Sequence, residues 1–151
     1  MKLIEFIRPD SIYVDVDVDS KKNLFKQISS IVYKNDLQKG STIIEKLNER
    51  ERLGSTGVGN GVAIPHSKIN TIKRTKVIFL KLKSAIDFSA SDKINVDIVF
   101  VILAPKDCQS EHLIVLSSIS SFLKRKNTIQ KLRDLKSPES IHNFFKKFSE
   151  D

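Results

Sequence analysis

The chain has 151 residues, of which 40% are hydrophobic and 29% charged, a size and composition that predict one soluble globular domain over residues 1–151. Its longest apolar stretch is far shorter than the roughly 20 residues that a membrane helix requires, and the first residues lack the pattern of a secretory signal. The single cysteine, Cys108, can form no internal disulfide, which is typical of a reducing compartment. We therefore expect a cytoplasmic protein that does not insert into a membrane.

The charge of the chain invites comparison with nucleic-acid-binding proteins. The formal net charge is +8, from 26 basic and 18 acidic residues, and basic proteins neutralise phosphates. However, the basic residues are scattered among Asp and Glu, and no nucleic-acid-binding motif accompanies them. We interpret the charge as mainly compositional, with a secondary role in attracting acidic protein partners. A basic nucleic-acid-binding module stays as the alternative from another functional class.

The chain begins with a pattern typical of a strand followed by a helix. Residues 12–18 alternate apolar and polar side chains, which predicts a strand with one face against the core. Asp19 or Ser20 can cap the next helix, and apolar residues at helical spacing extend it to about Tyr33. We therefore expect the first strand to lead directly into the first helix.

A second helix is expected between Gly40 and Gly54. Thr42 is followed three residues later by Glu45, which has the form of a capping box at a helix start. Glycine is a frequent residue just beyond a helix end. The pattern therefore predicts that this helix begins near Thr42 and ends at Gly54.

The second half of the chain predicts inner strands and then helices. Residues 76–82 and 94–103 are almost continuously apolar, as in strands covered on both faces. Three helices are expected after them, one capped by Ser110, one over residues 128–135 and one over residues 138–148. The whole order predicts a mixed α+β protein of the α/β class. Its architecture would be a three-layer α/β/α sandwich with a mixed parallel and antiparallel sheet flanked by helices.

A glycine-rich segment at residues 55–61 is the unusual part of the sequence. Three of the five glycines of the chain fall within five positions of it, which predicts tight backbone conformations or close approaches. The G-x-G-x-G spacing precedes a strand and no Gly-Lys-Ser/Thr follows, so neither a dinucleotide fingerprint nor a P-loop is present. Two interpretations stay open: a concavity of backbone N–H groups for phosphate oxygens, or a tight turn between helix and strand.

Three histidines are candidates for chemistry. His66 ends a short predicted strand over residues 62–66 and follows Pro65, which restricts the backbone, so its ring would be held stiffly. His112 falls in the first turn of a predicted helix, where free N–H groups favour an anion. His142 lies among aromatic and basic residues of the last helix with nothing that would make it reactive. We therefore expect His66 to be the reactive residue and His112 to lie where a phosphate group could bind.

One block of sequence resembles a known family. Residues 49–66 read ERERLGSTGVGNGVAIPH, which is similar to the active-site signature of phosphotransferase-system IIA domains of the fructose/mannitol class. The nearest likeness is to the nitrogen-regulatory branch. The similarity continues through residues 96–105 and 112–117, which look like the inner strand and the second-histidine helix of that family.

The resemblance implies roles for particular residues. His66 would be the phosphorylated nucleophile, His112 a supporting histidine, and Arg50 the cation that stabilises charge. The wall of the phosphate pocket would comprise a short set of loop residues: Ser55, Thr56, Gly57, Gly59, Asn60 and Gly61. Neither a cofactor nor a metal is implied. Ser67 departs from the family, whose members commonly carry glycine there.

The function expected from the resemblance is that of a phosphoryl carrier. A neutral imidazole nitrogen is a competent nucleophile near neutral pH. His66 would accept a phosphoryl group from an HPr/NPr-type phosphocarrier, and its phosphorylation state would regulate target proteins. The alternative within the family is a sugar-specific fructose/mannitol IIA component that passes the phosphoryl group to a IIB domain. We expect a monomer or weak homo-oligomer.

Overall fold

The computed structural model describes residues 2–108 and 110–150. Two short 3₁₀ turns, η1 and η2, open this part of the chain, and one strand, two helices, five strands and three helices follow them. The elements are η1 (Leu3–Glu5), η2 (Pro9–Ser11), β1 (Ile12–Val16), α1 (Lys21–Val32), α2 (Leu37–Arg52), β2 (Gly57–Gly59), β3 (Val62–Ala63), β4 (His66–Ile69), β5 (Lys76–Ile86), β6 (Val96–Pro105), α3 (Glu111–Lys124), α4 (Thr128–Asp134) and α5 (Pro138–Glu150).

The six strands form one mixed sheet in the order β1-β5-β6-β3-β2, with β4 also paired to β6. β5 and β6 are antiparallel, as are β2 and β3. β1 is parallel to β5, and both β3 and β4 are parallel to β6. β6 is therefore the central strand, and nearly every residue of it is buried, as its continuous apolar sequence predicts.

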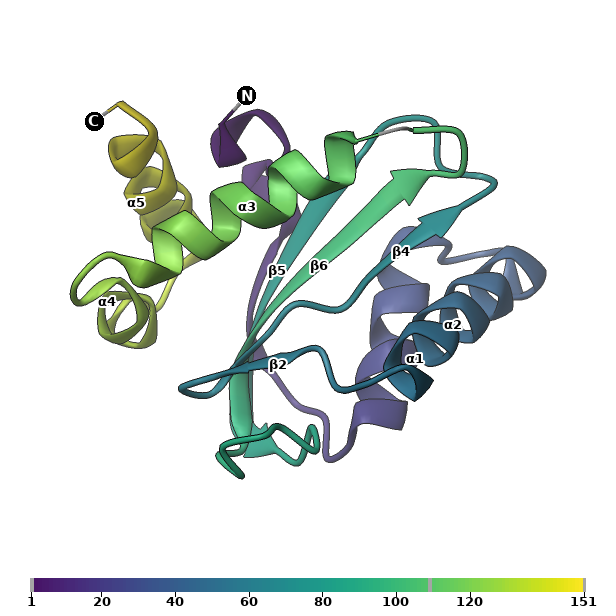
Figure 1. The fold of residues 1–151 in the computed structure, drawn as a ribbon, viewed down its shortest axis with the longest axis horizontal. Coiled ribbons are helices and arrows are strands. Elements are labelled where there is room, and N and C mark those ends of the chain that lie inside the picture. Colours follow the sequence, from purple (N-terminus) through teal and green to yellow (C-terminus); the bar gives the residue numbers. More distant parts are fainter. Residues whose placement is uncertain (1, 109, 151) are drawn as a thin grey trace.

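The sheet separates two hydrophobic layers. Successive residues of β6 point to opposite faces, so Val99 and Val101 pack with α1 and α2 while Phe100 and Ile102 pack with α3, α4 and α5. Figure 1 shows α1 and α2 on one side of the sheet and α3, α4 and α5 on the other. The predicted three-layer α/β/α sandwich with a mixed sheet is confirmed.

The start of the second helix differs from the prediction. α2 begins at Leu37, where the Asp36 carboxylate accepts a hydrogen bond of 3.0 Å from the backbone N–H of Lys39. The capping box at Thr42 and Glu45 is wrong, because both residues lie inside the helix and the Thr42 hydroxyl donates to the Gln38 carbonyl at 3.3 Å. The Asp36 carboxylate satisfies a free N–H group of the first turn, so the helix begins six residues before Thr42.

Gly40 is a packing residue and not a helix breaker. It is buried within α2, and a Cβ at this position would lie 2.4 Å from the Ser29 hydroxyl oxygen of α1. The glycine therefore allows α1 and α2 to approach each other closely. A lone sequence could not reveal this, because the partner residue comes from another helix.

Other element bounds need smaller corrections. β1 ends at Val16 and not at residue 18, β5 continues to Ile86, and β6 begins at Val96. Ser110 does occupy the N-cap position of α3, but its side chain forms no capping hydrogen bond. Within the part of the chain that the structure describes, no helix has the length and apolar character that a membrane span demands.

Candidate functional site

The stem that carries His66 is two short strands and not one. β3 ends at Ala63 and β4 begins at His66, both parallel to β6, and Pro65 stands in the gap. Proline has no N–H to donate, but its carbonyl accepts a hydrogen bond of 2.9 Å from the Ile102 N–H. The backbone on both sides of the histidine is therefore fixed to the central strand.

The contacts of the His66 ring indicate which of its nitrogens carries a proton. Nδ1 lies 2.8 Å from the Ile64 carbonyl oxygen. Because a carbonyl only accepts, this contact places the proton on Nδ1. Nε2 then carries the lone pair, and it accepts a hydrogen bond of 3.3 Å from Arg50 Nε. In this tautomer Nε2 is the ring nitrogen that can act as a nucleophile.

Arg50 lies in the last turn of α2 and reaches across to the histidine. Its Nη1 donates to the Gly54 carbonyl at 2.8 Å, which holds the guanidinium at the helix end. No carboxylate among residues 2–108 and 110–148 forms an ion pair with it. The charge of Arg50 is therefore available to an anion beside His66.

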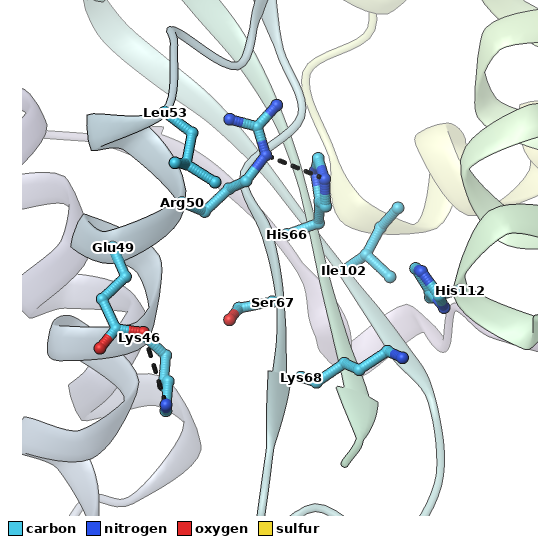
Figure 2. Close-up of a pocket in the computed structure, with 9 residues that line it drawn as sticks. All are labelled: Lys46, Glu49, Arg50, Leu53, His66, Ser67, Lys68, Ile102 and His112. Carbon is cyan, nitrogen blue, oxygen red and sulfur yellow. Dashed lines mark hydrogen bonds and ion pairs between the residues drawn. The ribbon is translucent and has the colours of Figure 1, made fainter. Parts of the chain in front are cut away.

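These two side chains line a hollow of about 260 Å³ (Figure 2). Residues of α2, β4, β6 and α3 line it, with Arg50 of α2 on one side of His66 and His112 of α3 on the other. The nine lining residues are Lys46, Glu49, Arg50 and Leu53 of α2, His66, Ser67 and Lys68 of β4, Ile102 of β6 and His112 of α3. Helix packing thus brings together the three candidates Arg50, His66 and His112.

The hollow has a net positive character. Lys46 pairs with Glu49 at 3.4 Å, so these two charges offset each other. Lys68 forms no ion pair in the described residues, and its Nζ donates to the Cys108 carbonyl at 3.2 Å. Two uncompensated cations, Arg50 and Lys68, therefore face one small concavity. This is the arrangement that a phosphoryl group with its negatively charged oxygens requires.

His112 lies in the first turn of α3, across Ile102 from His66 (Figure 2). Burial lowers the pKa of His112, and electrostatic interaction with Lys68 and His66 lowers it further. Its Nδ1 is 3.6 Å from the Cys108 thiol. A lowered pKa keeps His112 neutral near pH 7, so its ring can donate or accept a hydrogen bond without adding charge.

The glycine-rich segment lies beside the hollow and not in its lining. β2 and β3 form a hairpin whose turn has positive φ at Gly59, Asn60 and Gly61, which is the tight-turn interpretation of these residues. Gly57 serves a close approach, because a Cβ there would lie 2.9 Å from the Ala90 Cβ. The Asn60 N–H donates to Asp92 Oδ2 at 2.9 Å.

The hairpin is connected to His66 through its first residues. The Thr56 carbonyl accepts from the Ile64 N–H at 2.9 Å, and Ile64 in turn holds His66 Nδ1. Ser55 Oγ donates to the Phe88 carbonyl at 2.5 Å. Of the expected wall residues, Thr56 thus contacts the segment that carries His66, and Gly57 and Gly59 pair with β3 just before it.

Sequence reasoning assigned no role to Glu51, although the residue lies inside the family-like block. Its side chain is only 7% exposed and pairs with Lys21 Nζ at 2.8 Å. The carboxylate also accepts hydrogen bonds from the Thr56 hydroxyl and backbone N–H. The end of α2 is thus attached to the start of the hairpin. Spacing within the block gave no signal for this contact, because Lys21 comes from α1.

Lys68 was also missed by the sequence reasoning. It lies two residues after His66, so alternation along β4 places both on the same face. That spacing was a usable signal. His142, in contrast, is on α5 and does not line the hollow.

Comparisons with known proteins identify the family of the chain. The family model described as phosphoenolpyruvate-dependent sugar phosphotransferase system, EIIA 2, matches residues 5–148, so the chain belongs to this family. It is a IIA component of the fructose/mannitol class of phosphotransferase systems.

Its relatives include nitrogen regulatory proteins. The chain is 38% identical over 149 residues to a nitrogen regulatory protein homolog of Haemophilus influenzae, covering 96% of this chain and 91% of the relative. It superposes with a TM-score of 0.86 on the nitrogen regulatory protein IIA-Ntr of Neisseria meningitidis, at 31% identity and with 95% and 98% of the two chains covered.

A more distant structure shares the fold. This is enzyme IIA-mannitol in its complex with phosphorylated enzyme IIB-mannitol from Escherichia coli, with a TM-score of 0.68, 18% identity and coverage of 83% of this chain and 88% of that one.

Proposed function

We propose that this chain is a cytoplasmic phosphoryl carrier in which His66 Nε2 accepts a phosphoryl group from an HPr/NPr-type phosphocarrier. The observation that supports it is the orientation of one ring: Nδ1 is held by the Ile64 carbonyl, so Nε2 keeps its lone pair at the edge of a cationic hollow. A nucleophile with one fixed tautomer and an anion site beside it is what in-line phosphoryl transfer requires.

The chemical step follows from the contacts. The Nε2 lone pair forms a bond to phosphorus while the P–N bond to the donor histidine breaks and its electron pair returns to the donor nitrogen. The ring of His66 gains positive charge, and its Nδ1–H bond to the Ile64 carbonyl strengthens. Arg50 Nε–H, which donates to Nε2 in this structure, turns to a phosphoryl oxygen as phosphorus arrives.

The remaining residues act on the phosphoryl oxygens or on the stem. Lys68 supplies a second positive charge, and neutral His112 offers a ring N–H without repelling Arg50. Ser55, Thr56, Gly57, Gly59, Asn60 and Gly61 form the wall beside the site by holding the hairpin against the histidine stem. No ATP takes part, because the phosphoryl group arrives on a carrier.

The proposed output of phosphorylation is regulation of protein partners. A phosphoryl group adds about −1.5 to −2 charges at neutral pH, which reverses the character of a hollow that now carries uncompensated Arg50 and Lys68. Partners that complement the cationic surface would lose affinity and others would gain it. The similarity to nitrogen regulatory proteins of two species favours this role.

A sugar-specific role is the second candidate. The family is described as part of a sugar phosphotransferase system, and a fold neighbour was solved together with a phosphorylated IIB enzyme. Transfer of labelled phosphate from this chain to a fructose- or mannitol-type IIB domain would favour the sugar pathway, whereas retention of the label would favour regulation.

The test of the carrier role is phosphorylation of purified protein by a phosphorylated HPr-type donor. We expect acid-labile, base-stable phosphate on His66 of the wild type and of His142→Ala, and none on His66→Ala. Equal labelling of wild type and His66→Ala would refute the proposal.

A further inference from the structure

A second concave region lies at the opposite end of α3 from His112. The loop after α3 and helices α4 and α5 line an open groove of about 570 Å³. Figure 1 shows α4 and α5 at a distance from α2 and β4. Helix α3 has 14 residues and is therefore about 21 Å long. The groove and the hollow around His66 are thus separate surfaces.

The groove is lined by cations and by no carboxylate among the described side chains. Arg125, Lys126, Lys131 and Lys147 all face it. Asp134 and Glu139 belong to the same helices but lie outside the lining. One sign of charge therefore dominates a single concave surface, which is a condition for attracting an oppositely charged partner.

The three lysines among these cations, Lys126, Lys131 and Lys147, lack ion-pair partners in the described part of the chain, as does Arg125. Arg125 is held differently, with its guanidinium 4.6 Å from the centre of the Phe148 ring. A bound anion would therefore meet three ammonium groups without an ion pair and one guanidinium that packs on an aromatic ring.

The groove also offers apolar and amide surface. Leu135, Phe144 and Phe148 contribute apolar area between the cations, and Asn127 and Asn143 contribute amide groups. An occupant that matches both parts has carboxylates next to apolar side chains. The open form of the groove suits an extended chain better than a small molecule, because small-molecule sites enclose most of their ligand.

We propose that this groove docks an acidic, partly apolar polypeptide segment of a partner protein, independently of the phosphorylation of His66. The separation along α3 allows a phosphoryl donor at the hollow and a docked segment at the groove to bind together. The carrier could then bring its donor close to the protein that it regulates, since two sites on one molecule raise effective concentration.

The test uses unphosphorylated protein, so its outcome does not depend on the carrier role. The probe is a fluorescein-labelled synthetic peptide of about 12 residues in which Glu alternates with Leu and Phe, titrated by fluorescence anisotropy at low and physiological salt. We expect saturable binding that weakens by about tenfold or more in Lys126→Glu/Lys131→Glu, because two attractive contacts become repulsive. Backbone amide shifts in α4 and α5 would locate the peptide.

The matched control is Lys22→Glu/Lys26→Glu, two exposed lysines of α1 on the other face of the sheet. It lowers the net charge equally and should leave the affinity within about twofold of wild type. Absence of peptide binding, or equal weakening by both pairs, would overturn the proposal. Tighter binding of a labelled single-stranded DNA oligomer, lost in the same groove variant, would overturn it in favour of a nucleic-acid site.

Discussion

The hollow around His66 and the groove beside α5 are both cationic, yet they are organised differently. In the hollow, Arg50 and Lys68 are held by backbone carbonyls at 2.8 and 3.2 Å and surround one imidazole with a fixed tautomer. In the groove, three lysines have no ion-pair partner within the described residues, and no histidine lies among the lining residues. Positive charge alone thus attracts anions, whereas chemistry needs a positioned nucleophile in addition.

Among the substitutions that test this difference, Arg50→Ala should have the largest effect, on the rate of phosphoryl transfer. Arg50→Ala removes the cation nearest Nε2 and should slow phosphoryl transfer by roughly 100-fold, the magnitude typical of a lost charge-stabilising donor. Rapid-quench measurement of label uptake from a phosphorylated HPr-type donor gives the rate. Arg52→Ala, an exposed neighbour outside the hollow, is the control and should transfer normally. A wild-type rate in Arg50→Ala would place the cation outside the mechanism.

A large loss of stability is expected on substitution of Glu51, which joins the end of α2 to Lys21 of α1 and to Thr56 before the hairpin. Glu51→Ala leaves Lys21 and the Thr56 N–H without their partner and should lower the free energy of unfolding by about 2 kcal/mol. Glu49→Ala breaks a pair whose side chains are 40% and 47% exposed, so it should cost no more than about 0.5 kcal/mol. Urea denaturation of both variants measures the difference. Equal costs would show that the Glu51 network does not anchor the hairpin.

A smaller effect on the rate is expected at His112. His112→Gln keeps a hydrogen-bonding side chain but loses the ring N–H, and transfer should slow by roughly tenfold while His66 remains phosphorylatable. The same quench assay tests this. An unchanged rate would remove His112 from the transfer step.

His112 should also contribute to the pH dependence of stability. Its pKa is lowered in the folded protein, so the unfolded chain, where histidine titrates near 6.5, binds the proton more readily. The free energy of unfolding should therefore decrease as the pH falls from about 6.5 to the lowered pKa of His112, and this contribution should level off below that pKa. His112→Gln should lack this component in urea denaturation at successive pH values. An identical pH profile in both proteins would contradict the assignment.

The smallest effect is expected in the groove. Lys131→Ala removes one of several like charges that have no ion-pair partner, so it should raise the free energy of unfolding by about 0.3 kcal/mol at low salt, and less at high salt. Urea denaturation at two salt concentrations measures this. A clear destabilisation would indicate that the lysine has a structural contact and would weaken the contrast between groove and hollow.

The sequence predicted the fold class well because its patterns are local. Alternation over residues 12–16, the apolar run of β6 and helical spacing before and after it each need only neighbouring residues. The prediction failed where a contact from elsewhere decided the outcome. Gly40 looked like a boundary, but it lies inside α2 at a point where Ser29 of α1 leaves no room for a side chain.

For the candidate site, the sequence by itself determined the residue types: a histidine behind a proline, a hairpin rich in glycine, and a second histidine at a helix start. Tertiary structure decided which of them meet. It placed Arg50, His66, His112 and Lys68 around one hollow. It also paired the glycine-rich β2 with β3 outside the lining of that hollow, and it formed the basic groove from the loop after α3, α4 and α5. Local propensity acts over a few residues, whereas distances between side chains on different elements are set by the packing of the whole sandwich.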